Sequence, residues 1–285
     1  MCTFPGQIQT VWMVNPQYYR VEYAINPHMK NKDGTLNLVD PNTAMKQWRS
    51  LKAKFAALSV EVIELAGQPD FPDLVFCANQ TFPFINLKTK RKSIVLSQMR
   101  APQRQGEVGY FQNEAEKLGY DVFRLETKGA SFEGNGDLIP QPKTTNLWGG
   151  CGPRTDESVY QELRRRFDLN ITSLRLVDPQ FYHLDTCFSV LSHDTVAIVK
   201  MAFEPEALPL IQKQFKNVIE IPYQEALTTF AGNSFCPDGK NIISHPGASE
   251  FKRLAEGLRF LIHEIDTSEF MKSGGSVFCM KMALL

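Results

Sequence analysis

Cys279 is the residue in this sequence whose type and setting best fit a nucleophile. It follows Gly274 and Gly275 in the apolar segment KSGGSVFC. The reactive form of cysteine is the thiolate, and a nearby cationic substrate or histidine would favour it by lowering the pKa of the thiol. A structural cysteine buried in the core is the alternative for any single cysteine in an apolar segment.

His183 is the leading candidate for acid–base chemistry. It lies in the segment FYHLDTCF with Asp185 two residues on, whereas the other histidines (28, 193, 245 and 263) lack comparable polar neighbours. A histidine can protonate a departing amine and then activate the water that attacks a covalent intermediate. Neither step requires a metal, so we expect no metal and no cofactor. A histidine satisfied within the core is the alternative.

Acidic residues are placed where they could bind a cationic substrate. Glu133 and Asp137 flank glycines in FEGNGD, for which a polar turn is the alternative because Gly and Asn adopt positive φ angles. A guanidinium is planar and presents its donors in a fork that matches a carboxylate, so acids in a cleft suit an arginine-like substrate. Asp185 could supply a second contact of this kind.

Two arginines could bind a substrate α-carboxylate. They are Arg104 in PQRQGE and Arg154 in GPRTD, and a surface or helix-start role is the alternative for each taken alone. The G-N-G and G-G-C-G stretches do not indicate a phosphate loop, because neither G-x-G-x-x-G nor G-x-x-x-x-G-K-[ST] is present.

Strand-length apolar runs alternate with amphipathic helical stretches, which indicates an α/β protein. From residue 74 the order is strand, strand, helix, strand: LVFC, SIVL (93–96), a helix over about 107–118 and VFRL (122–125). The same order recurs three times. The second unit has strands DLIP and NLWGG, a helix over 156–168 and strand LRLV (174–177). The third has CFSV, VAIV, a helix over 204–215 and VIEI, and the fourth has NSFC, NIIS, a helix over 248–258 and FLIHE. The chain ends supply a fifth copy from SVFC, YAIN, a helix capped by Asp40 and Pro41, and VIEL (62–65).

The spacing of these units favours a repeat architecture. Their third strands begin near residues 62, 122, 174, 218 and 261, which lies within the range of known repeats, although any α/β chain offers runs that can be phased by chance. No linker rich in Pro, Gly or Ser divides the chain, so we predict one domain over 1–285 whose terminal segments close a ring. Polar residues, including Asn79 and Asn233, are expected just after the first strand of a unit. His183 and Asp185 instead come just before the first strand of theirs. A ring would therefore gather them at its axis.

Composition excludes several classes of protein. The 285 residues are 43% hydrophobic, and the 31 basic and 31 acidic side chains cancel, so no net charge recruits nucleic acid or an anionic membrane. The first ten residues do not resemble a signal peptide, and no apolar run approaches the roughly 18 residues of a membrane span. We expect a cytoplasmic protein. Its six cysteines (2, 77, 151, 187, 236 and 279) form no C-x-x-C pair, which argues against a disulfide framework or a common zinc module.

Five segments together resemble the guanidine-modifying enzymes of the pentein, or amidinotransferase-like, superfamily. These are YAINPHM, PDLVFCAN, FEGNGD, FYHLDTCF and KSGGSVFC, and within the superfamily the chain most resembles the catalytic domain of cyanobacterial-type arginine dihydrolase. The resemblance implies a five-bladed α/β propeller, with Cys279 as nucleophile, His183 as the histidine and Glu133 as the acid that pairs with the guanidinium. It also implies substrate contacts from Asp185, Asn79, Asn26, Arg104 and Arg154.

Asn79 bears on how many hydrolyses occur. Deiminases and dimethylarginine hydrolases resemble one another in placing an acid at this point, whereas dihydrolases are similar to this chain in having asparagine. A carboxylate suits only a cationic guanidinium, but a carboxamide can also hold the neutral ureido product. The resemblance thus implies hydrolysis of arginine to ornithine, carbon dioxide and two ammonia.

Several alternatives remain open at this stage. Gln80, Thr81, Asn135 and Ser276 depart from the family pattern near the expected pocket, so an N-substituted or acylated arginine or agmatine could be the substrate. A related hydrolase that stops at citrulline is a second hypothesis, and a non-catalytic binding protein on the same scaffold is a third. The sequence leaves open whether the chain forms a homo-oligomer.

Overall fold

A computed structural model describes residues 3–285, and its strands form five small sheets. Four sheets have three strands, of which the middle strand pairs antiparallel with one neighbour and parallel with the other. A parallel pair requires a crossover connection, and a helix supplies it in each sheet. The predicted strand, strand, helix, strand order is therefore present in these four sheets.

The bounds of the elements follow the chain. The first sheet has β14 (Met282–Ala283), β1 (Thr10–Val14) and β2 (Glu61–Leu65), with helix α1 (Pro41–Ala57). The second has β3 (Thr81–Asn86), β4 (Arg91–Leu96) and β5 (Asp121–Phe123), with α2 (Pro102–Gln105) and α3 (Glu107–Lys117). The third has β6 (Leu138–Pro140), β7 (Asn146–Cys151) and β8 (Asn170–Arg175), with α5 (Glu157–Phe167). The fourth has β9 (Phe188–Val190), β10 (Thr195–Ile198) and β11 (Asn217–Glu220), with α6 (Ala207–Gln214). The fifth has β12 (Asn241–Ser244) and β13 (Leu261–Glu264), with α8 (Ser249–Gly257).

Shorter helices lie in the connections. The α-helical ones are α4 (Gly134–Asp137), α7 (Tyr223–Thr229) and α9 (Ser268–Met271). The 3₁₀ turns are η1 (Pro16–Tyr18), η2 (Pro27–Met29), η3 (Leu184–Thr186), η4 (Lys200–Ala202) and η5 (Ala231–Asn233).

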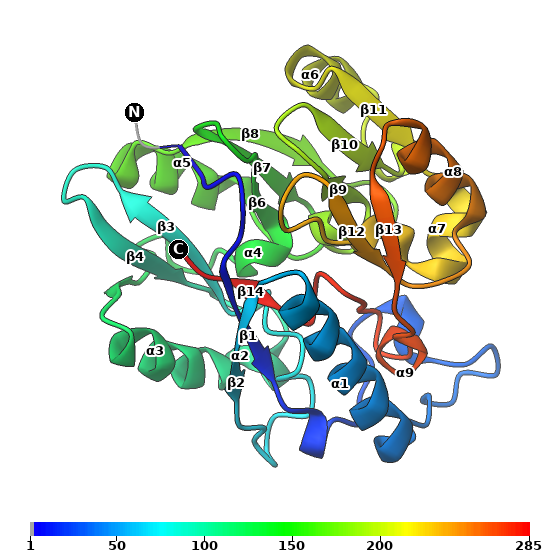
Figure 1. Cartoon of the computed structure of the whole chain (residues 1–285). Helices are drawn as coiled ribbons and strands as arrows, with labels where there is room; N and C mark the ends of the chain where they lie inside the picture. The colour runs from blue at the N-terminus through cyan, green and yellow to red at the C-terminus, as the bar shows by residue number, and fades with distance from the viewer. Residues whose placement is uncertain (1–2) are drawn as a thin grey trace.

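The two ends of the chain meet in one sheet. Strand β14 pairs antiparallel with β1, where Val11 lies opposite Ala283. Figure 1 shows β14 beside β1 in the middle of the molecule, with α1, α3, α5, α6 and α8 toward the outside. The predicted pairing of the N- and C-terminal segments is confirmed.

Helix α1 shows how local sequence sets an element. Asp40 caps its start by accepting a hydrogen bond from Thr43 N at 2.6 Å, and Pro41 occupies the first turn, as predicted. Its buried face carries Ala44, Trp48, Leu51 and Phe55, which recur every three to four residues. That face packs into the largest hydrophobic core cluster, which also contains Cys279.

Several predicted strands are wrong. LVFC (74–77) and SVFC (276–279) are turns, NSFC (233–236) contributes only a bridge from Phe235 to Ile243, and the strand expected at YAIN is β1 instead. Strand β8 begins four residues earlier than expected. A short apolar run predicts burial, but a buried turn satisfies the same pattern as a buried strand.

Residues 3–285 contain no candidate membrane helix and no candidate metal cluster. No helix there is long and apolar enough to cross a membrane. No group of three or more His, Cys, Asp or Glu side chains there could hold a metal ion. Of the six cysteines, 77, 151, 187, 236 and 279 are free and buried, whereas residue 2 lies outside the described range.

Candidate active site

The candidate residues precede the first strand of each unit, rather than follow it as predicted for most of them. Glu133 lies five residues before β6 and His183 five before β9, while Asp185 and Cys279 lie three before β9 and β14. Asn79 lies two residues before β3. Side chains remote in sequence therefore occupy equivalent places in different units, and the hydrogen bonds described next bring them together.

Cys279 is held by two polar side chains. Its Sγ–H donates to Asp185 Oδ2 at 3.2 Å, and Asn233 Nδ2 donates to the sulfur at 3.1 Å. Burial raises the pKa of Cys279, and the nearby carboxylate raises it further. Burial likewise raises the pKa of Asp185 to about 7. A cation bound beside this pair would favour loss of the thiol proton.

Asn233 holds the turn that carries Cys279, a role that the sequence did not indicate. Its Oδ1 accepts from the backbone N–H groups of Ser276 and Cys279, at 3.0 and 3.2 Å. Its Nδ2 also donates to the backbone oxygen of Asp185 at 2.8 Å. One buried amide thus ties the cysteine turn to the turn that contains His183 and Asp185. Its polar side chain at the start of the predicted strand NSFC was the only signal.

Glu133 connects His183 to Arg154. His183 Nε2 lies 2.6 Å and Arg154 Nη1 2.9 Å from Glu133 Oε2, while Arg100 N donates to Oε1 at 3.1 Å. Burial raises the pKa of Glu133, but Arg154 and His183 outweigh it and lower the pKa to about 2. Glu133 is therefore charged, and its Oε2 is the hydrogen-bond partner of His183 Nε2. His183 Nδ1 has no hydrogen-bond partner within residues 3–285, so that nitrogen is free for chemistry.

The Asp137 carboxyl group accepts hydrogen bonds from two nearby residues. Thr155 Oγ1 donates to Oδ2 at 2.6 Å, and Leu184 N donates to Oδ1 at 2.9 Å. Burial raises the pKa of Asp137 to about 6. The carboxyl group holds the backbone next to His183 in place, and its predicted contact with substrate stays a prediction.

Asn79 and Arg104 form one network with a carboxylate that the sequence did not single out. Arg104 Nη1 donates to Asn79 Oδ1 at 2.8 Å, and its Nη2 lies 2.9 Å from Glu107 Oε2. Gln80 Nε2 donates to the same Glu107 oxygen at 2.6 Å. Because Arg104 can only donate, it fixes the orientation of the Asn79 amide. Asn79 Nδ2 has no partner among the described residues.

The glycines of FEGNGD allow this close approach. A Cβ at Gly136 would overlap Asn79 Nδ2 and would lie 3.6 Å from His183 Cγ. Gly134 has φ of +54°, which most residues avoid, and its missing Cβ would face the backbone oxygens of Asn79 and Thr81. The segment brings its backbone against Asn79 because side chains are absent there.

Asp73 is a further buried acid that sequence reasoning missed. Its side chain is 2% exposed, and neither carboxylate oxygen has a partner within the described range. Burial raises its pKa, whereas the nearby Arg104 lowers it. The only signal was an acid at the start of PDLVFCAN.

Residues 20–38 cross the site and join opposite parts of the fold. Arg154 Nη2 donates to the backbone oxygen of Ile25 at 2.7 Å, and Asn26 Nδ2 donates to Ser273 O at 2.9 Å. Cys279 is only 2% exposed and His183 only 1%.

Comparison with known proteins identifies the family. The model for eukaryotic N,N dimethylarginine dimethylhydrolases matches residues 15–285. The chain belongs to this family. The predicted resemblance to the pentein superfamily of guanidine-modifying enzymes is confirmed.

Relatives of this family member include enzymes with different activities. It is 31% identical over 95% of its length to the bifunctional arginine dihydrolase/ornithine cyclodeaminase AgrE of Nostoc sp., but it spans only 37% of that protein. It is 32% identical over 95% of its length to the N(G),N(G)-dimethylarginine dimethylaminohydrolase of Mycobacterium tuberculosis and spans 84% of it. The product-bound N-terminal domain of ArgZ, an arginine dihydrolase of cyanobacteria, matches with a TM-score of 0.88 at 28% identity, covering 97% of each chain.

Proposed function

We propose that this chain is a single-domain, five-bladed propeller enzyme that hydrolyses the guanidinium group of arginine twice. The products would be ornithine, carbon dioxide and two ammonia, formed from arginine and two waters. Similarity to arginine dihydrolases supports the reaction class. The free Nδ2 of Asn79 is the observation that carries the proposal of a second hydrolysis.

In the first cycle Cys279 Sγ loses its proton to solvent and attacks the guanidinium carbon. Asp185 and Glu133 accept hydrogen bonds from the cation, which lowers the pKa of the thiol. The protonated His183 donates its Nδ1 proton to the departing nitrogen as the C–N bond breaks, and ammonia leaves. Water then gives a proton to Nδ1 and attacks the S-linked carbon, which releases the sulfur and forms a ureido group.

The Asn79 amide suits the second cycle. Arg104 already occupies its oxygen, so the group that Asn79 offers is an N–H donor. A donor cannot pair with the N–H groups of a guanidinium, but it can pair with the carbonyl oxygen of a ureido group. The ureido product is then held against Cys279 for a second attack, which expels the second ammonia and leaves an S-linked carbonyl. The second water releases this group as a carbamate, which loses carbon dioxide to give ornithine.

Other charged side chains would bind the amino-acid end of the substrate. Arg154 and Arg104 are the proposed ligands of the α-carboxylate, and Arg154 has more donors left because it uses only two of its five N–H groups. Asp73 is a proposed ligand of the α-ammonium, because it is a buried acid without a hydrogen-bond partner among residues 3–285. Asn26 would contact the substrate from residues 20–38.

Product analysis tests this proposal. Purified protein incubated with arginine should yield ornithine and two ammonia per arginine consumed, as measured by mass spectrometry and an ammonia assay. Cys279→Ser should abolish ammonia release, whereas Cys236→Ser should retain it. Citrulline as the only, stable product would exclude the double hydrolysis.

Asn79→Asp tests the role of the amide directly. Arg104 can still donate to one carboxylate oxygen, but the other oxygen now accepts hydrogen bonds and repels a ureido oxygen. We expect citrulline to accumulate while the first hydrolysis continues. Unchanged ornithine formation in Asn79→Asp would show that the amide does not control the second step.

Hydrolysis of a methylated arginine is the second candidate function. The family match and the relative from Mycobacterium tuberculosis favour it. The same incubation with dimethylarginine distinguishes the two, because dimethylamine and citrulline would then be the products.

A further inference from the structure

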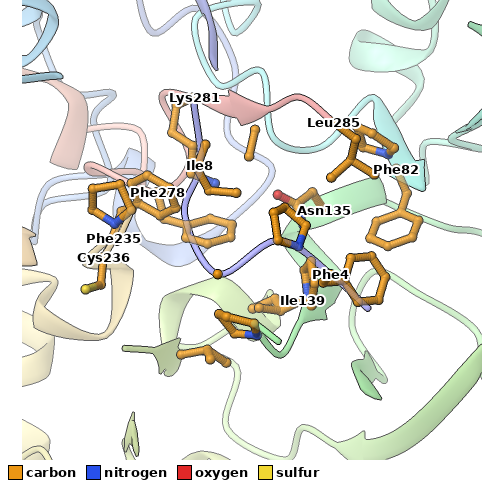
Figure 2. A pocket seen from close by; sticks show the side chains of 18 residues that line it. Phe4, Ile8, Phe82, Asn135, Ile139, Phe235, Cys236, Phe278, Lys281 and Leu285 are labelled. Atoms are coloured by element: carbon orange, nitrogen blue, oxygen red, sulfur yellow. The ribbon is translucent and has the colours of Figure 1, made fainter. Parts of the chain in front are cut away.

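A chamber of about 70 Å³ lies outside the candidate active site, and none of the candidate catalytic residues lines it. Its wall is mostly apolar and is built from segments far apart in the sequence. Figure 2 shows Phe4 and Phe82 toward one side of the chamber and Phe235 and Phe278 toward the other. The chamber is therefore a second concave site of the fold, separate from the one that would hold arginine.

The N-terminal segment forms one wall of the chamber. Over residues 3–9 exposed side chains alternate with half-buried ones, and Phe4 and Ile8 are half-buried and line the chamber. Backbone hydrogen bonds fix the segment in two places. Phe4 N donates to Thr144 O at 2.8 Å, and Ile8 N donates to Pro237 O at 2.7 Å. This wall is therefore held in place by the rest of the fold.

Lys281 carries the one charged side chain that lines the chamber within residues 3–285. It is 0% exposed, and its Nζ has no hydrogen-bond partner in that range. The Nζ lies 3.2 Å from the ring centroid of Phe278 and 4.6 Å from that of Phe235, and both rings belong to the chamber wall. Aromatic faces attract a cation but replace only part of its lost hydration. An ammonium at this wall therefore lacks an acceptor.

The other polar groups of the wall do not supply that acceptor. Asn135 Nδ2 donates to Leu138 O at 2.8 Å, and the Leu285 backbone oxygen accepts from Tyr120 Oη at 3.1 Å. Burial raises the pKa of Cys236 to about 12, so this thiol is neutral. In the described part of the chain, no acidic side chain lines the chamber to balance the ammonium.

The charge of Lys281 depends on pH. Burial lowers its pKa to about 7, and Asp185, Cys77 and Cys279 act against this shift. Burial in turn raises the pKa of Asp185 to about 7, that of Cys77 to about 12, and that of Cys279 above its ordinary value. At pH 6 the lysine is therefore mostly protonated, while these three groups are mostly neutral.

We propose that the chamber is a binding site for a short aliphatic carboxylate of the size of acetate or propionate. The carboxylate accepts a hydrogen bond from Lys281 Nζ, and the alkyl end packs against the apolar wall. Small-molecule sites commonly combine such a wall with a few polar groups that fix orientation. Since a cavity of about 150 Å³ holds one benzene molecule, a chamber about half that size fits a ligand of about three to five non-hydrogen atoms.

A titration of the whole protein with propionate tests the site. Affinity is measured by ligand-observed NMR at pH 6, with sodium chloride holding the ionic strength constant. Lys281→Met removes the charge and keeps an apolar chain of similar length. Hydrogen bonds to charged groups are worth at least a factor of ten, so this variant should bind propionate at least about tenfold more weakly than the wild type. Lys281→Gln repeats the measurement if the Met variant does not fold.

The chemistry of the ligand is tested on the wild-type protein. Propionamide has the size of propionate without its charge, and it should bind at least about tenfold more weakly. Affinity should be greatest for acetate or propionate and should fall for hexanoate, which exceeds the chamber. It should also fall as the pH rises above 7, because Lys281 then loses its charge.

A matched pair of variants tests the location. Val190 lines the chamber, so Val190→Phe should fill part of it and weaken propionate binding. Val177 is 51% exposed and lies outside the chamber, so Val177→Phe should bind like the wild type.

Three results would overturn the proposal. They are no propionate binding by the wild type, equal affinity in Lys281→Met, and an affinity that keeps rising with chain length. Propionate held by the arginines of the active site would give the second result. Because no arginine is present, the outcome does not depend on whether the proposed hydrolysis occurs.

Discussion

Replacing Glu133 by glutamine removes one charge from the centre of the candidate site and leaves its shape. In the native protein both oxygens accept hydrogen bonds, from Arg100 N on one side and from Arg154 and His183 on the other. A glutamine amide must turn its NH₂ group toward one of these donors. Glu133→Gln therefore loses a charge and leaves at least one buried donor without an acceptor.

The structure sets the size of the effect. The pKa of Glu133 falls from 4.5 to about 2. Such a shift corresponds to about 3 kcal/mol of stability at neutral pH. This contribution is present above the unfolded pKa and is lost as the pH falls through the folded pKa. A domain stable by about 5–15 kcal/mol survives the loss, so activity can be measured. His183 loses its charged hydrogen-bond partner, and general acid–base catalysis is worth about 10²–10⁴ in rate.

The assay measures ammonia release and urea unfolding for Glu133→Gln beside a matched control. Glu162 is also a buried carboxylate. It accepts hydrogen bonds from the backbone N–H groups of Glu126 and Thr127 and from Arg166 Nη1, but it lies on α5 away from His183. Burial raises the pKa of Glu162, but its hydrogen bonds outweigh this and lower it to about 2. Glu162→Gln should lose stability and keep kcat. The reasoning is refuted if Glu133→Gln also keeps kcat within about threefold of the wild type.

Two further predictions concern the glycine turn and the buried acids. Gly136→Ala should displace Asn79, lower the free energy of unfolding by about 1–3 kcal/mol and abolish activity. Gly109→Ala in α3, where a Cβ meets nothing within 4 Å, should be neutral or stabilise the protein by up to about 1 kcal/mol. Urea unfolding and ammonia release are measured for both variants. Asp137 and Asp185 have folded pKa values raised from 3.8 to about 6 and about 7, so their contribution to stability is complete below the unfolded pKa and is lost as pH rises toward 7. Asp137→Asn should accordingly gain stability relative to the wild type between pH 4 and pH 7, and a constant difference in urea midpoint across that range would contradict this.

Local sequence was sufficient to predict the five crossover helices (α1, α3, α5, α6 and α8) and most parallel strands, but not α2, α4, α7 or α9. Helix α1 begins at the Asp40 cap because a side-chain acceptor and Pro41 satisfy its first turn without help from the rest of the chain. Its amphipathic face repeats with the period of a helix. The apolar runs at 74–77 and 276–279 misled the prediction, since a buried turn and a buried strand share the same composition.

The residue types needed for guanidine chemistry, and their order, could be read from the sequence itself. Cys279, His183 and Glu133 were nominated because thiol, imidazole and carboxylate chemistry depends on residue type. Which end of the Asn79 amide is occupied and which acid faces the thiol were decided only by the tertiary structure. Those relations join positions as far apart as 94 residues, as in the bond from Cys279 to Asp185. They depend on how separate units pack, and no local pattern encodes a distance between units.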